Sequence, residues 1–255
     1  MRVVSKLLLV FVFMLWTNAA LRAEEHATDD EVYEYVTTVP RNIEKDLGQL
    51  TRYLVRPYND KYDKAKAIAF WIASHVVYDG FIFKDKPNAF GYNEMTSFGK
   101  KYGGQHAWEL AESRVGICED YSELFMDMAI RAGIRAKIET GKIRRVGEEY
   151  KHIPKRFDLE HAWNSFKYNG RDIYVDVTWM ANGPKMMPEN GNLITESQHN
   201  RAVKKRKKEN RKESRIYPIN PYYFDFDYDK YNKDSHPRNE RNDTGTYRIK
   251  DRYYR

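Results

Sequence analysis

A single cysteine, Cys118, stands in the stretch RVGICEDYS, in a chain of 255 residues. A thiolate is a strong nucleophile, and it is activated by a base that a third group holds in place. His161 and Asp176 follow the cysteine along the chain and could supply these two roles. Taken singly, a free cysteine is usually a small buried hydrophobic residue, a lone histidine is usually structural, and a lone aspartate is usually solvated. The three together favour a thiol nucleophile, its base and an orienting carboxylate.

The segment that opens with Cys118 has the pattern of an amphipathic helix. Its apolar residues recur at helical spacing, and Gly133 is suited to end the helix. Unpaired N–H groups and the positive end of the helix dipole stabilise a thiolate at such a helix start. Glu119 and Asp120 oppose the thiolate if their carboxylates lie close. We therefore expect Cys118 to need an imidazolium partner.

Short strands are predicted after this helix, over 135–141, 161–168 and 171–179. Asn169-Gly170 joins the last two, and this dipeptide is a strong hairpin signal that fixes the register. In that register His161 and Asp176 are diagonal neighbours on one face, with α-carbons about 7 Å apart. The imidazole and the carboxylate are therefore within reach of a hydrogen bond. The predicted cross-strand pairs are Tyr168–Arg171, Trp163–Asp176 and His161–Thr178. The predicted core face carries Ala162, Phe166, Ile173, Val175, Val177 and Trp179.

Helices dominate the chain before the cysteine. Apolar spacing predicts helices over 43–54 and 62–76 and a short helix from 105 to about 116. Between them, 81–104 is predicted to be a long loop, either a lid over a cleft or an ordinary surface excursion. Helices are thus followed by short strands along the chain, and Cys118 is expected at the start of a helix.

The N-terminus has the pattern of a secretory signal peptide. Arg2 and Lys6 precede an apolar run, Leu7 to Trp16, which is shorter than the roughly 20 residues that span a membrane. Cleavage is expected after Ala23, and an uncleaved anchor is the alternative. The protein is therefore predicted to be exported, periplasmic or secreted, and not an integral membrane protein.

The net charge of +7 is concentrated in one tract. Nine basic and two acidic residues fall between Arg201 and Arg215. This tract could contact an anionic surface, or it could be a solvated helix or loop. It lacks interleaved aromatic residues, which argues against nucleic-acid binding. The cations proposed for the surface contact are Lys204, Lys205, Arg206, Lys207 and Lys208.

No metal or cofactor is predicted, because the chain has no second cysteine and no HxxxH spacing. The acidic run at 224–234 is a weak candidate for a calcium site. An EF-hand loop needs a glycine and a closing glutamate, and this run lacks both.

Four blocks of the sequence, in order, resemble the transglutaminase-like superfamily: 65–80, 113–141, 161–166 and 174–179. The resemblance covers about 40–182 and implies an α+β fold related to that of papain-like cysteine proteases, with the nucleophile at the N-terminus of a helix packed on an antiparallel sheet. It also implies that Cys118 is the nucleophile, that His161 is its partner and that Asp176 orients the imidazole. The tail at 221–237 more loosely resembles the aromatic segment, ending in His-Pro, of bacterial and kyphoscoliosis-peptidase-like members.

This resemblance implies an acyl-transfer enzyme acting on protein or peptide amides. Whether the thioester meets water or an amine is left open, and so are a catalytically inactive scaffold and a surface-attachment protein. Gln105 and Trp108 are weak candidates for oxyanion donors, with loop polarity and core packing as their alternative roles. Other histidines that could compete with His161 are His106, His152 and His236. The predicted organisation is a signal peptide (1–23), a polar leader (24–39), the core domain (40–182), a basic insertion (183–216) and a tyrosine-rich extension (217–255), packed on the core or partly disordered.

Overall fold

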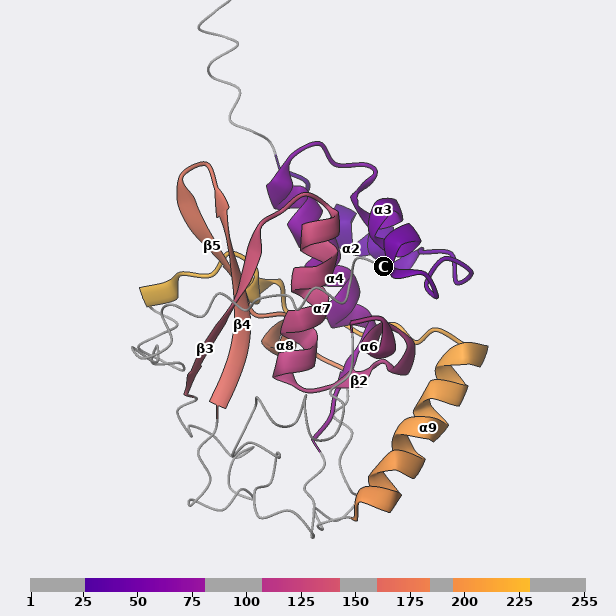
Figure 1. Ribbon diagram of the computed structural model, residues 1–255. Coiled ribbons are helices and arrows are strands. Elements are labelled where there is room, and N and C mark those ends of the chain that lie inside the picture. Colours follow the sequence, from indigo (N-terminus) through magenta and orange to yellow (C-terminus); the bar gives the residue numbers. More distant parts are fainter. Residues whose placement is uncertain (1–25, 81–106, 143–159, 184–194, 230–255) are drawn as a thin grey trace, which may run out of the picture.

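The computed structural model describes residues 26–80, 107–142, 160–183 and 195–229. In chain order these residues form α2 (Asp29–Thr37), α3 (Leu47–Val55), α4 (Lys61–His75), β1 (Val77–Tyr78), α6 (Ala107–Ser113), β2 (Val115–Gly116), α7 (Cys118–Arg131), β3 (Ala136–Lys142), β4 (Glu160–Tyr168), β5 (Arg171–Val175), α8 (Val177–Met180), α9 (Glu196–Lys212) and a 3-10 turn (Pro221–Tyr223). Helix α7 packs between the β3-β4-β5 sheet and the helices α3 and α4 (Figure 1). The α+β prediction is confirmed.

The N-terminal helices α2, α3 and α4 contribute many of the buried residues of the main hydrophobic core. Helix α4 begins where Asp60 accepts hydrogen bonds from the amides of Tyr62 and Asp63, the usual role of an aspartate at a helix start. The polar leader predicted at 24–39 contains helix α2, and its Val32 and Val36 are fully buried in the core. This part of the leader therefore packs with the domain.

The hairpin of β4 and β5 has the predicted turn. Asn169 and Gly170 both have positive φ, 46° and 82°, as a two-residue hairpin of this type requires. Tyr168 pairs with Arg171, in the predicted register. The extension of the second strand to residue 179 is wrong, because β5 ends at Val175 and Asp176 starts helix α8. The predicted pairs of Trp163 with Asp176 and of His161 with Thr178 therefore do not form.

The connection from α6 to α7 also differs from the prediction. Helix α6 ends at Ser113, because Arg114 has a φ of 59° and so leaves the helical conformation. The next two residues form β2, which pairs in parallel with β1. A Cβ atom at Gly116 would lie 2.6 Å from Leu110 Cδ1 and 2.9 Å from Asp120 Cβ. The chain just before Cys118 therefore requires glycine at position 116.

Helix α9 contains most of the basic tract and packs against α6 at the edge of the molecule (Figure 1). Two of the five cations predicted to contact an anionic surface face the protein instead. Arg206 is buried and donates to the Tyr217 hydroxyl, while Lys207 pairs with Glu112 at 2.5 Å. Contact with an anionic surface stays a prediction for the exposed residues Lys204, Lys205 and Lys208.

The segment after α9 returns to the core. Phe224 forms a bridge with Val175, and both Phe224 and Phe226 are buried. The predicted signal peptide, the loop at 81–104 and the end of the tail lie outside the described residues. Among the described helices, none is long and apolar enough to cross a membrane.

Candidate functional site

Cys118 is the first residue of α7, as predicted, and only 1% of its surface is exposed. It lies in a small apolar cluster with Ile138 of β3 and Ala162 of β4, so the thiol sits where the helix start meets the sheet. The preceding residue, Ile117, is extended, and its amide donates to Asp120 Oδ2 at 2.9 Å. This hydrogen bond holds the chain as it enters the helix.

The ionisation state of Asp120 affects how strongly this carboxyl group would repel a thiolate at Cys118. Burial raises the pKa of Asp120 well above its usual range, although the hydrogen bond from Ile117 acts in the opposite direction. A raised pKa favours the neutral carboxyl. Asp120 therefore opposes a thiolate at Cys118 less than an ionised carboxylate would.

His161 and Asp176 form a buried hydrogen bond, with 2.7 Å between His161 Nε2 and Asp176 Oδ2. The two side chains are 2% and 0% exposed. The predicted contact is present, but its geometry differs from a diagonal pair on two strands. Asp176 caps α8 instead: its Oδ1 accepts from the amide of Trp179 at 2.9 Å, which leaves Oδ2 for the imidazole.

The imidazole of His161 also interacts with Cys118. Burial acts to lower the pKa of His161, but the charge and hydrogen bond of Asp176, followed by the hydrogen bond and charge of Cys118, raise it to about 10. Because Asp176 holds Nε2, the remaining ring nitrogen, Nδ1, is left for the thiol. The arrangement can carry an imidazolium between a carboxylate and a thiolate.

Two tryptophan rings lie close to the imidazole of His161. The ring of Trp163 lies 6.0 Å from that of His161, at 27°, and the ring of Trp179 lies 5.8 Å away. The Asp176 amide donates to the Tyr223 carbonyl at 2.9 Å, and the Tyr223 ring meets Trp179 edge-on. The segment after α9 thus holds Asp176 in place, a contact that the sequence did not reveal.

Asn164 is a second residue that the sequence did not single out. Its side-chain amide donates to the Ser122 carbonyl at 3.1 Å and to the Lys137 carbonyl at 3.3 Å. The amide is buried and joins α7 to the sheet. It therefore fixes the helix that carries Cys118 relative to the strand that carries His161.

The remaining predicted residues are not brought to this site. Gln105 lies outside the described residues, as do the competing histidines His106, His152 and His236. Trp108 is 52% exposed and lines a cavity whose lining includes none of the three central residues, which gives no support to an oxyanion role. A second histidine–aspartate pair, His199 with Asp79 at 2.5 Å, links α9 to the end of β1.

One group of side chains in the described part of the chain could hold a metal ion. Ligand atoms of His26, Asp60 and Asp63 lie within 4.8 Å of one another. Asp60 Oδ1 already accepts two amides at the start of α4, so the group has a structural role without a metal. In the acidic run considered for calcium, Asp225 is paired with Arg171 at 2.5 Å.

The model of the transglutaminase-like superfamily matches residues 48–182. Among solved structures, one described as a TGase shares 16% identity, with a TM-score of 0.36, and the match covers 71% of this chain and 40% of that one. A "putative cysteine protease" from Cytophaga hutchinsonii shares 18% identity, with a TM-score of 0.35 and coverage of 58% and 42%. This chain spans about two fifths of the length of these proteins. No curated protein matches it. The family match covers more than half of the chain, which therefore belongs to the transglutaminase-like superfamily.

Proposed function

We propose that the protein is a thiol enzyme that transfers acyl groups from amides of proteins or peptides, with Cys118 as nucleophile, His161 as base and acid, and Asp176 as the orienting group. Members of this superfamily are generally cysteine hydrolases or transferases. The observation that carries the proposal is the hydrogen bonding of one imidazole to both partners, to Asp176 at 2.7 Å and to the thiol. We also propose that the enzyme acts outside the cytoplasm, because residues 1–23 have the pattern of a signal peptide.

The chemistry follows from the charges at the site. The Cys118 thiolate attacks the carbonyl carbon of a carboxamide and forms a C–S bond. Amides of the first turn of α7 stabilise the oxyanion, because the first amides of a helix have no partner within the helix. His161 then gives its proton to the leaving nitrogen as the C–N bond breaks, and ammonia or an amine departs. Water or a second amine attacks the thioester, gives its proton to His161 and releases the thiolate.

The proposal is tested by trapping the acyl enzyme. The purified protein is incubated with a glutamine-containing protein such as casein, with and without a primary amine, and Cys118 is analysed by mass spectrometry while released ammonia is assayed. We expect a thioester at Cys118 that is lost in Cys118→Ala and in His161→Ala. His199→Gln is the matched control, because it breaks a histidine–aspartate pair elsewhere.

Incorporation of the added amine identifies a transamidase, and free acid alone identifies a hydrolase. Peptide and protein libraries extend the test if casein is not a substrate. A library screen with no thioester and no product would contradict the proposal and would favour a scaffold role.

A further inference from the structure

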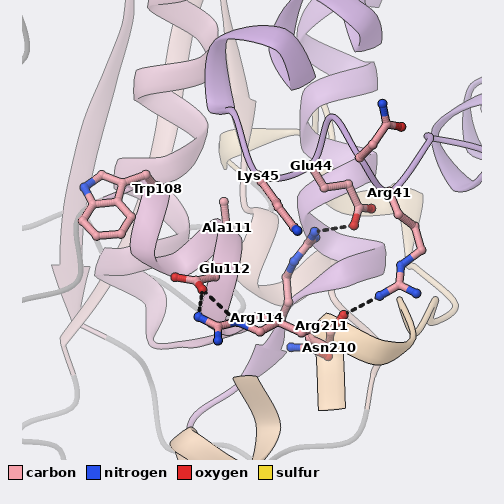
Figure 2. A pocket seen from close by; sticks show the side chains of 10 residues that line it. Arg41, Glu44, Lys45, Trp108, Ala111, Glu112, Arg114, Asn210 and Arg211 are labelled. Atoms are coloured by element: carbon pink, nitrogen blue, oxygen red, sulfur yellow. Dashed lines mark hydrogen bonds and ion pairs between the residues drawn. The ribbon is translucent and has the colours of Figure 1, made fainter. Parts of the chain in front are cut away.

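A second site is suggested by a cavity of about 420 Å³ between the turn before α3, helix α6 and the end of α9 (Figure 2). Its lining includes none of Cys118, His161 and Asp176. Four of the lining side chains are cationic and two are acidic, and the exposed ring of Trp108 lies among them. The charged lining residues are Arg41, Lys45, Arg114 and Arg211, with Glu44 and Glu112.

Arg114 is the buried cation of this cavity, with 5% of its surface exposed. Its Nη2 lies 3.2 Å from Glu44 Oε2, and its guanidinium stacks over the ring of Trp71 at 4.3 Å. Its Nη1 is buried and has no hydrogen-bond partner among the residues that the structure describes. A buried charged donor without an acceptor is costly, so this nitrogen is suited to an acceptor from a ligand.

The backbone conformation of Arg114 indicates that its side chain has a role at this position. Its φ of 59° lies in the left-handed region, where glycine is the favoured residue at the end of a helix. Its backbone contacts, from its amide to Leu110 and from Val77 to its carbonyl, are ones that glycine could make without strain. An arginine at this position therefore differs from glycine only in the contacts that its side chain makes.

The cavity holds more positive than negative charge. Lys45 is exposed, points toward the Arg114 guanidinium in Figure 2 and has no ion-pair partner in the part of the chain that the structure describes. Arg41 donates to the carbonyl oxygens of Asn210 and Lys212 rather than to a carboxylate. Burial lowers the pKa of Arg114 to about 10, and the charges of Arg206 and Arg41 add to this effect against that of Glu44.

We propose that this cavity binds a carboxylate group of a peptide, with Arg114 Nη1 and Lys45 Nζ as donors and the Trp108 ring as a contact for the peptide chain. Arginine recognises carboxylates through directed hydrogen bonds, and Arg114 already binds one in Glu44. A dianionic phosphate is less suitable, because the carboxylates of Glu44 and Glu112 would repel it. Because Nη1 is closed off from water, side chains at the cavity must move to admit the ligand, and the exposed Lys45, which points toward the guanidinium in Figure 2, is the one we expect to move.

The test is an NMR titration of the purified protein at constant ionic strength. The probes are an acetylated and amidated tetraglutamate peptide, the matched tetraglutamine peptide and inorganic phosphate. The indole N–H signal of Trp108, assigned with Trp108→Phe, reports binding at the cavity. We expect saturable shifts with tetraglutamate alone, and binding about two- to fivefold weaker in Lys45→Gln, as for the loss of one exposed charge contact. Lys208→Gln is the matched control, since Lys208 is exposed on α9 and does not line the cavity.

Equal affinities of Lys45→Gln and Lys208→Gln would overturn the proposal, because binding would then follow the overall charge. Equal shifts with tetraglutamine, or the absence of shifts with tetraglutamate, would also overturn it. Phosphate binding as tight as that of the acidic peptide would overturn the assignment to a carboxylate. Because Cys118 takes no part in the titration, each of these results is independent of the catalytic proposal.

Discussion

Replacing Asp176 with asparagine removes the charge beside His161 and largely preserves the shape of the side chain. The pKa of His161 is raised from 6.5 to about 10, a difference that corresponds to roughly 4–5 kcal/mol between its charged and neutral forms. Asp176 is the largest contributor that raises this pKa, and burial acts against it. An opposite charge at hydrogen-bonding distance typically contributes about 1–3 pKa units. In Asp176→Asn we therefore expect the imidazolium to lose its proton about 1–3 pH units lower than in the unmodified protein.

The assay is an NMR pH titration of the His161 ring, from about pH 5 to 11. Because thiol and imidazole titrate together, the titration is repeated in the Cys118→Ala background, which isolates the contribution of Asp176. Asp172→Asn is the matched control, since Asp172 lies on β5 and pairs with the exposed Lys167 at 2.9 Å. A His161 titration near pH 6.5 in the unmodified protein, or the same titration in Asp176→Asn, would refute the reasoning.

Four further predictions concern stability, each measured by urea denaturation. The raised pKa of His161 contributes fully to the free energy of unfolding below about pH 6.5, and the contribution is lost as the pH rises through about 10; a flat profile up to pH 10 would count against it. Burial lowers the pKa of His75 to about 3, so its contribution is complete above about pH 6.5 and is lost as the pH falls toward 3; His75→Gln should flatten this acid limb. Gly116→Ala should lower the free energy of unfolding by about 1–3 kcal/mol, because the new methyl group would overlap Leu110; a change below about 0.5 kcal/mol would show that the site can relax. Phe224→Ala should cost about 3–5 kcal/mol if the segment after α9 is part of the core, and a cost near zero would separate it from the core.

Helix α7, which begins at Cys118, and the hairpin could be predicted because their signals are local. Helical spacing after Cys118 and the Asn169-Gly170 turn depend on residues close in sequence, and the structure has both. The end of β5 could not be predicted, because VDVTW alternates like a strand. The carboxylate of Asp176 instead caps the Trp179 amide and ends the strand. The histidine–aspartate contact thus exists through a cap rather than through cross-strand pairing.

The support around the site depends on contacts between distant parts of the chain. Tyr223 lies 47 positions after Asp176 and binds it through a backbone carbonyl, which any residue type could supply. The raised pKa of Asp120 depends on burial that no local pattern encodes. The basic tract illustrates the same limit: composition predicted its charge, but not that Arg206 would be buried against Tyr217.

The most direct test of the central claim is the pH dependence of Cys118 alkylation by iodoacetamide, in the unmodified protein and in His161→Ala. Cys118 is the only cysteine of the chain, so the modification reports a single site. Its burial slows the reagent at every pH, and the shape of the profile rather than the absolute rate is therefore compared. The account predicts that, relative to the maximal rate of each protein, Cys118 of the unmodified protein is alkylated faster than that of His161→Ala at neutral and mildly acidic pH, because the imidazolium stabilises the thiolate. The same profile in both proteins would contradict the pairing of Cys118 with His161.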